Sequence, residues 1–350
     1  MILSPARLEP VFYRRPWGAL SLAPFFSEQT NLAEPVGEAW MTSNECKFAD
    51  GPFRGKTLGE AWREMPPEWA GTHVDRDAPF PLLVKFIFSE QKLSVQVHPH
   101  DAYAAQHEKA AGGRGKTEMW YVMCAEPGAE VLAGLRPGAT REKFERAIRE
   151  NTAEDWLEHV PVKSGDSVFV PAGTLHTIGP GLVLCEIQEH SDLTYRVYDY
   201  NRRDAQGRAR ELHVEKALDV IQFGEQSGGK IEPARIERGA VTTTYFVACR
   251  YFATEKWEFS ERVASATSRE HFDLLIVLDG RGNLHWRDQR AEYAPMQVWM
   301  LPAALGAYQL IPDSRTSVLR SYVPQNVDEF VRRLADQGIP ESVWSRLVYP

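Results

Sequence analysis

Residues 165–176 constrain the fold of this chain more than any other segment. They read Gly-Asp-Ser-Val-Phe-Val-Pro-Ala-Gly-Thr-Leu-His. A glycine turn leads into a run of apolar residues that is typical of a buried strand. Pro171 and Gly173 then predict a tight corner, because proline restricts φ and glycine adopts positive φ. His176 follows this corner, so the pattern predicts an imidazole on a rigid turn, well placed to bind a metal ion.

Many other short apolar runs bounded by Gly, Pro and Asp predict a mainly β protein. Strands are expected over residues 81–88, 94–98, 118–124, 167–170, 182–187, 251–257, 272–278, 298–301 and 317–322. Helical patterns are fewer and cover residues 140–149, 214–221 and 327–334. The fold class expected from these patterns is therefore mainly β, with a few short helices.

The length of 350 residues is enough for two hydrophobic cores. Residues 224–230, Gly-Glu-Gln-Ser-Gly-Gly-Lys, form the stretch most typical of a linker. We therefore expect a metal-binding domain over residues 1–223, a linker over 224–230, and a second domain over 231–350 that ends in a helix. Strands that end in a Pro-containing turn occur in both halves and hint at two related β-barrels.

The overall charge limits the class of partner. Forty Lys and Arg against 48 Asp and Glu give a net charge of -8, which argues against general binding to nucleic acid or to an anionic membrane. No apolar run reaches the about 18 residues of a membrane-spanning helix, and the first residues lack a signal-peptide core. The four cysteines are widely spaced and are expected to be free thiols. We therefore expect a cytoplasmic protein.

A metal site at His176 needs partners on neighbouring strands. Gln96 and His98 share one face of a predicted strand because side chains alternate along it, and Glu118 begins the next apolar strand. His98, Glu118 and His176 supply two imidazoles and a carboxylate, with the Gln96 amide oxygen either as a fourth ligand or as a hydrogen-bonding neighbour. These ligands suit zinc, or iron and manganese where the geometry allows.

The remaining histidines lack such spacing. His100 lies past Pro99, where the strand is expected to break, so it is expected outside the ligand set. Surface or structural positions are expected for His107, His159, His190 and His213.

Several segments together resemble the type I mannose-6-phosphate isomerases (phosphomannose isomerases) in their shorter bacterial form, within the cupin superfamily. The resemblance is carried by residues 93–99, 115–121, 165–176 and 194–199, and residues 14–18 and 37–40 resemble the N-terminal pieces of the family. It implies two cupin-type (jelly-roll) β-barrels. It also implies an aldose–ketose isomerase that interconverts mannose 6-phosphate and fructose 6-phosphate through an enediolate, with one Zn²⁺ per chain.

The resemblance also assigns residues to roles. It places the metal ligands at Gln96, His98, Glu118 and His176, and the catalytic arginine at Arg196. The positions that resemble substrate-pocket residues of the family are Ser94, Lys116, Glu186 and Arg202.

Proton transfer needs a group that titrates. Arg196 cannot be the base because guanidinium stays protonated, so it is expected to act as a fixed positive charge. Glu186, Lys116 and a metal-bound water remain the candidates for the base. Glu186 lies in an apolar run where an unpaired carboxylate is costly, which favours a place in a pocket. Lys116, two residues before Glu118, is expected on the same side of its strand.

The phosphate group of the substrate needs cations. Between residues 196 and 210 the chain has five arginines against two aspartates, a local reversal of the net charge. Arg202 is the first choice for bidentate phosphate binding, whereas Arg208 and Arg210 are expected to be solvated. In the second domain, residues 302–308 resemble the corner before His176 but contain no histidine, and His285 has no evident partner. This domain is therefore expected to be metal-free and structural.

Two other functions fit the same metal ligands. One is a cupin oxygenase that binds iron, and the other is a non-catalytic sugar-binding cupin. The arginines favour the isomerase, because an oxygenase has no need of a phosphate site. The partner expected is thus a hexose 6-phosphate, with no nucleic acid and no membrane, and no oligomeric state is predicted.

Overall fold

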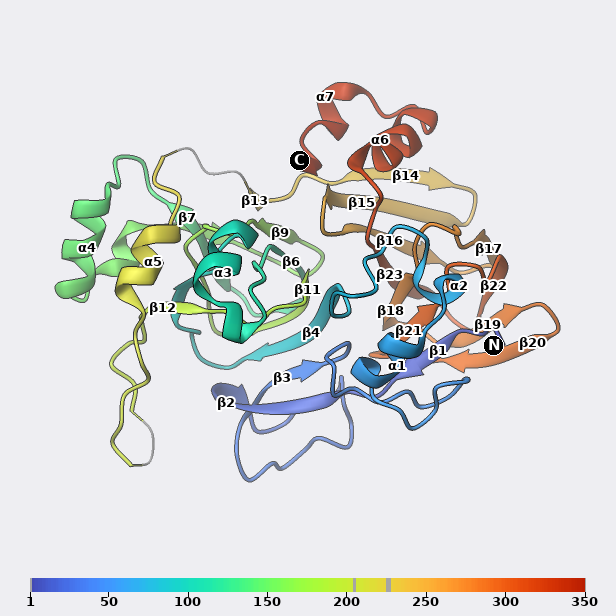
Figure 1. Ribbon diagram of the computed structural model, residues 1–350, viewed down its shortest axis with the longest axis horizontal. Helices are drawn as coiled ribbons and strands as arrows, with labels where there is room; N and C mark the ends of the chain where they lie inside the picture. The colour runs from blue at the N-terminus through green and yellow to red at the C-terminus, as the bar shows by residue number, and fades with distance from the viewer. Residues whose placement is uncertain (1, 204–205, 225–227, 350) are drawn as a thin grey trace.

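The computed structural model describes residues 2–203, 206–224 and 228–349, and it is mainly β, as expected (Figure 1). The first unit has two sheets. Its larger sheet contains, in spatial order, β13 (Gly229–Lys230), β9 (Ser167–Val170), β6 (Glu118–Ala125), β11 (Leu182–Glu189), β4 (Leu82–Ser89), β3 (Val36–Trp40) and β2 (Val11–Ala19). Its smaller sheet contains β12 (Tyr195–Tyr198), β5 (Val95–Val97), β10 (His176–Ile178), β7 (Glu130–Leu135) and β8 (Leu157–Pro161).

The second unit repeats this arrangement. Its larger sheet contains β1 (Ala6–Leu8), β21 (Val298–Leu301), β18 (Asp273–Asp279), β23 (Thr316–Tyr322), β16 (Ala253–Phe259), β15 (Val241–Cys249) and β14 (Ala234–Arg238), with β24 (Val348–Tyr349) beside β15. Its smaller sheet contains β17 (Val263–Ala266), β22 (Ala307–Pro312), β19 (Gly282–Trp286) and β20 (Gln289–Tyr293). Strand by strand, the order 9-6-11-4-3-2 of the first unit corresponds to 21-18-23-16-15-14 of the second.

Chain position alone does not separate the two units. The N-terminal strand β1 pairs with β21 and so extends the sheet of the second unit. In the corresponding place in the first unit, β13 pairs with β9. β13 is part of the predicted linker, of which residues 225–227 lie outside the described residues. The domain limits at 223 and 231 stay a prediction.

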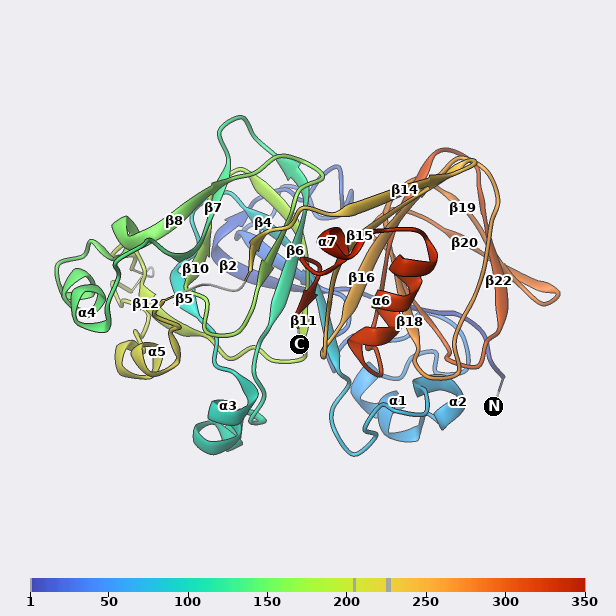
Figure 2. The same ribbon diagram turned by 90° about the horizontal axis from the view of Figure 1, so that it is seen from above.

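The two larger sheets pack against each other through a shared apolar core (Figure 2). Across this contact the rings of Tyr121 and Phe246 have centroids 5.7 Å apart. The opposite face of β6 carries Trp120 into a separate core between the sheets of the first unit, and Trp257 lies in the equivalent core of the second. Central strands are therefore buried on both faces, which explains their continuous apolar sequences; every residue of β4 is buried.

Helices lie at the edges of the sheets. The three predicted helices are confirmed as α4 (Arg141–Arg149), α5 (Val214–Val220) and α6 (Val327–Asp336). Thr140 caps α4 by accepting a hydrogen bond from the backbone N–H of Lys143. The sequence patterns missed α1 (Leu58–Glu64), α2 (Pro67–Ala70), α3 (Asp101–His107) and α7 (Glu341–Trp344), which are at most seven residues long. In the described part of the chain, no helix has the length and apolar character needed to cross a bilayer.

A buried histidine of the second unit has two acidic neighbours. The His271 side chain is fully buried, with Nδ1 3.3 Å from Asp273 Oδ1 and Nε2 3.6 Å from Glu329 Oε1. Burial by itself lowers the pKa of His271, but the carboxylates of Asp273 and Glu329 outweigh it and raise this pKa to about 9. The protonated imidazole therefore stabilises the folded state.

We expect the free energy of unfolding to fall as the pH rises through about 9. An unfolded histidine has a pKa of about 6.5, so the stabilisation is complete below that pH and is lost as the folded-state pKa is passed. The loss amounts to about 3 kcal/mol. Urea unfolding between about pH 6 and pH 10 measures it, and His271→Gln removes this component. His285→Gln is the matched control, because His285 is a half-buried histidine of the same unit that forms no ion pair with an acidic group among the described residues. An unchanged pH dependence in His271→Gln would contradict the assignment.

Candidate active site

Three buried side chains from neighbouring strands converge in the first unit. His98 directly follows β5, Glu118 begins β6 and His176 begins β10. Glu118 Oε2 lies 3.6 Å from His98 Nε2, and Glu118 Oε1 lies 3.4 Å from His176 Nε2. One nitrogen or oxygen atom from each of the three lies within 4.8 Å of the others. The structure therefore brings together three of the four predicted metal ligands.

The hydrogen bonds of the two imidazoles suit metal binding. Nδ1 of His98 lies 2.8 Å from the Leu193 carbonyl oxygen, and Nδ1 of His176 lies 2.9 Å from the Thr174 carbonyl oxygen. A carbonyl only accepts, so both Nδ1 atoms carry the proton and both Nε2 atoms present a lone pair towards Glu118.

Two atoms of this group are buried without a hydrogen-bond partner, namely His176 Nε2 and Glu118 Oε1. Burial lowers the pKa of His176 to about 4, which keeps the ring neutral at pH 7. A neutral imidazole and a carboxylate oxygen that both lack a donor are costly to bury unless a cation lies between them. The group therefore fits a divalent ion such as zinc.

Gln96 lies beside this group. In the strand register it is opposite His176 of β10 on one side and Arg196 of β12 on the other. Its half-buried side chain lines the cavity described next. Direct coordination by the Gln96 amide stays a prediction, which this position supports.

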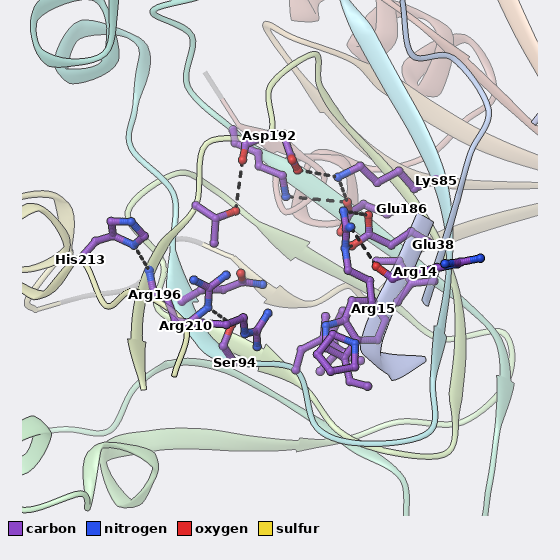
Figure 3. A pocket seen from close by; sticks show the side chains of 18 residues that line it. Arg14, Arg15, Glu38, Lys85, Ser94, Glu186, Asp192, Arg196, Arg210 and His213 are labelled. Carbon is purple, nitrogen blue, oxygen red and sulfur yellow. Dashed lines mark hydrogen bonds and ion pairs between the residues drawn. The ribbon is translucent and has the colours of Figure 1, made fainter. Parts of the chain in front are cut away.

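A cavity of about 470 Å³ adjoins the three convergent side chains (Figure 3). The predicted site residues Ser94, Gln96, Lys116, Glu186 and Arg196 all line it. Lys116 joins the cavity to the three side chains, since its Nζ lies 3.1 Å from His98 Nε2 and also bonds to Glu118.

Glu186 is held by two lysines and a tryptophan. Its Oε1 lies 3.7 Å from Lys116 Nζ and 3.5 Å from Lys85 Nζ, and its Oε2 accepts a hydrogen bond of 3.0 Å from Trp120 Nε1. Burial disfavours the charge on Lys85, but the carboxylates of Asp192 and Glu186 outweigh this and raise its pKa. Glu186 is thus a paired carboxylate on a cavity wall, as its place in an apolar strand predicts.

Arginines form the other side of the cavity (Figure 3). Arg196 donates through Nε to Ser94 Oγ at 3.2 Å and through Nη1 to the Glu211 carbonyl at 3.0 Å. Its backbone N–H lies 3.3 Å from Nδ1 of His213, which also lines the cavity. The contact with the Arg196 backbone is structural, as expected for His213, but its place beside the cavity was not expected. Its distance in sequence from the metal motifs concealed this.

Arg202 and Arg210 lie differently relative to the cavity than expected. Arg202 bonds to Asp199 Oδ1 at 2.6 Å and to the Lys92 carbonyl at 2.7 Å, and it is not among the lining residues. Arg210 does line the cavity and bonds to Asp199 Oδ2 at 2.7 Å. The expectation of a solvated Arg210 is therefore wrong, whereas Arg208 is exposed as expected. Arg208 and Arg210 lie in the same segment, between β12 and α5, so composition alone could not distinguish them.

Further charged residues of the cavity were missed from sequence: Arg14, Arg15, Glu38, Lys85 and Asp192. Arg15 is paired with Glu38, with Nε 3.0 Å from Oε1 and Nη2 2.8 Å from Oε2. One signal was available for Lys85, because it is a lone charge in an apolar strand, as Glu186 is. The two are direct partners in the β4–β11 register.

His100 lies outside the metal group, as predicted, and instead begins α3, where its ring accepts a hydrogen bond from the Tyr103 backbone. In the described part of the chain no disulfide forms; Cys46, Cys185 and Cys249 are buried thiols and Cys124 is exposed.

Comparisons with known proteins agree with this geometry. A family model described as phosphomannose isomerase type I, catalytic domain, matches residues 6–124, and one described as mannose-6-phosphate isomerase, cupin domain, matches residues 242–323. The chain is 35% identical to a mannose-6-phosphate isomerase of Bacillus subtilis over 89% of this chain and 96% of that protein. It is also 35% identical to a mannose-6-phosphate isomerase of Streptococcus mutans, over 80% of this chain and 86% of that protein.

Solved structures share the fold. The crystal structure of a Bacillus subtilis mannose 6-phosphate isomerase superposes with a TM-score of 0.83 at 32% identity, covering 91% of this chain and 99% of that one. A mannose 6-phosphate isomerase bound with zinc and yttrium superposes with a TM-score of 0.71 at 15% identity, covering 91% and 99%. With its relatives matched over nearly their full length, the chain belongs to the type I phosphomannose isomerase family.

Proposed function

We propose that this chain interconverts mannose 6-phosphate and fructose 6-phosphate. One observation carries the proposal: the buried His98, Glu118 and His176 group adjoins, through Lys116, a cavity whose far side carries arginines. Isomerisation needs charge stabilisation at the C1 and C2 oxygens and a separate cationic subsite for the phosphate dianion. The relatives named above support the same substrate.

One Zn²⁺ per chain is proposed, held by His98, Glu118 and His176 with the Gln96 oxygen as fourth ligand. When bound, zinc supplies a positive charge that stabilises the enediolate oxygens. The lone pairs of the two Nε2 atoms and the unpartnered Glu118 Oε1 support this set, as does the zinc in a protein of the same fold.

Proton transfer between C1 and C2 is assigned to the titratable groups of the cavity wall. Lys116 and Glu186 lie 3.7 Å apart, so a proton taken by one can be shared with the other during the transfer. Arg196 supplies a fixed positive charge, and Ser94 orients its guanidinium through the 3.2 Å hydrogen bond.

The phosphate subsite is assigned to Arg210 with Arg196. Both line the cavity, and a guanidinium binds phosphate with two parallel hydrogen bonds. Arg202 acts as a positioning residue in this proposal, because it holds the Asp199 carboxylate that in turn holds Arg210. A cytoplasmic location is also proposed, supported by the free cysteines.

A coupled assay on mannose 6-phosphate tests the proposed reaction. We expect chelation, His98→Ala and Arg196→Ala each to lower kcat/KM by more than about 100-fold. Chelation and His98→Ala remove the charge of the metal ion, and Arg196→Ala removes a guanidinium charge, so each change weakens the stabilisation of the enediolate. His285→Ala, a change of the same kind in the second unit, is expected to leave it unchanged. Unaltered turnover in His98→Ala would show that the metal centre is misassigned. Oxygen uptake with bound iron, and no isomerisation, would identify an oxygenase instead.

Zinc content after dialysis tests the ligand set independently of activity. We expect about one zinc per chain in the wild type, and an affinity weakened more than about 100-fold in His176→Ala, which loses an imidazole ligand. Competition with a chromophoric chelator measures the affinity, and circular dichroism confirms folding. Gln96→Ala distinguishes ligand from neighbour: an affinity equal to wild type would exclude the amide from the coordination shell.

Arginine variants test the phosphate subsite. We expect Arg210→Ala to raise KM for mannose 6-phosphate about tenfold or more, since a direct phosphate contact is lost. Arg202→Ala should have a smaller effect, and Arg208→Ala, on the same exposed connection, should have none. A larger rise in KM for Arg202→Ala than for Arg210→Ala would support direct binding by Arg202 instead.

A further inference from the structure

We propose that the second unit contains a separate binding site for a small organic phosphate, such as a sugar phosphate. The site is a cavity of about 330 Å³ bounded by β14, β15, β16, β17 and α6. In Figure 1 these elements lie on the far side of the molecule from α4 and α5. The residues that carry the argument are Arg238, Tyr245, Trp257, Arg262, Ser265 and Arg333.

The cavity occupies the same place in the second unit as the active-site cavity does in the first. The repeat in sheet order makes β14, β15, β16 and β17 the equivalents of β2, β3, β4 and β5, which line the first cavity. The strand register agrees with this equivalence. Arg14 of the first cavity is opposite Val36, the first residue of β3. Arg238 of the second cavity is opposite Val241, the first residue of β15. The backbone of the second unit therefore presents an arginine at the same position in the wall of its cavity.

One substitution between the units removes a carboxylate from the wall of the second cavity. Glu38 is the third residue of β3 and is opposite Ile87 of β4. Thr243 is the third residue of β15 and is opposite Trp257 of β16, the equivalent of β4. Thr243 therefore stands where Glu38 does. Glu38 is the carboxylate that pairs with Arg15. Thr243 carries no charge, and none of the residues that line the second cavity is acidic.

The second cavity also has arginines available for an anion. Arg238 and Arg262 are exposed, and in the described part of the chain neither has a hydrogen bond or ion pair to a protein group. Arg333, from α6, is already paired with Glu255 at 2.8 Å. Two unpaired guanidinium groups at one cavity favour a phosphate, which accepts bidentate hydrogen bonds from each.

The remaining wall suits the organic part of such a ligand. Tyr245 and Trp257 lie in the cavity wall and are 4% and 7% exposed. Ser265 adds a hydroxyl group. Aromatic surface with a few polar groups is typical of small-molecule sites, and the volume is about that of the smaller ones. A cavity of about 330 Å³ has more volume than inorganic phosphate alone would fill.

The chemistry of the first unit has no counterpart at this second site. Ala307 begins β22 as His176 begins β10, so the second corner offers no imidazole. Glu186 is opposite Lys85 in the β11–β4 register, and the equivalent pair in the second unit has the charges reversed, Arg320 opposite Glu255. We therefore infer a site that binds its ligand without isomerising it.

Equilibrium dialysis of the metal-loaded full-length chain with sorbitol 6-phosphate tests this site. Sorbitol 6-phosphate has no carbonyl group, so the isomerase centre cannot convert it. We expect Arg238→Ala/Arg262→Ala to bind one molecule fewer per chain than the wild type, or to bind the second molecule about tenfold or more weakly. Both side chains are exposed, so folding should be unaffected. Arg290→Ala, an exposed arginine of β20 outside the cavity, controls for net charge.

Two outcomes would overturn the proposal. Equal stoichiometry and affinity in the wild type and the double variant would show that the cavity binds no phosphate. Labelled orthophosphate in the same experiment distinguishes an organic phosphate from inorganic phosphate. Binding as tight as that of sorbitol 6-phosphate would overturn the proposal that the ligand is organic. Turnover of mannose 6-phosphate should be equal in the double variant and the wild type, which keeps this test distinct from that of the active site.

Discussion

The active site depends on the pairing of charges that the larger sheet of the first unit buries. Lys85, Lys116, Glu118 and Glu186 are each at most 4% exposed. Any one of them alone would cost several kcal/mol to bury, so each is tolerable only because an opposite charge lies beside it. The antiparallel register enforces this, since it places Glu186 opposite Lys85 in the neighbouring strand. Removing one of these side chains leaves an opposite charge buried without its partner, so the four charges depend on one another.

The second unit shows that the same backbone supports a different solution. Arg320 donates to Glu255 at 3.1 Å and to Asp273 at 3.0 Å, so a protein cation already lies between the buried carboxylates there. In the first unit two acceptor atoms, on Glu118 and His176, remain without a donor. The first unit thus presents a carboxylate and two imidazoles that fit a metal cation, whereas the second places a guanidinium among its buried carboxylates, although both units have equivalent strands and a cavity at equivalent places.

Much of the fold and of the metal group was predictable because their signals are local. Alternation along a strand aligns side chains two residues apart, and the proline–glycine corner positions His176. The fold class, the longer strands and the three longer helices follow from such patterns. Arg210 and Lys85 were not predictable in this way. Their direction depends on partners about 10 or 100 residues away, Asp199 and Glu186, and on which strands become neighbours.

The sequence by itself determined a mainly β chain with a His, Glu and His group, and a likeness to the isomerase family. These conclusions rest on short-range periodicity and on motif spacing. The tertiary structure was needed to show which arginine faces the cavity of the first unit and that β1 completes the sheet of the second unit. It alone also revealed a second, arginine-lined cavity, in which Arg238 stands where Arg14 does in the first unit. Contacts between strands far apart in the chain have no local signature, so they appear only once the sheets have formed.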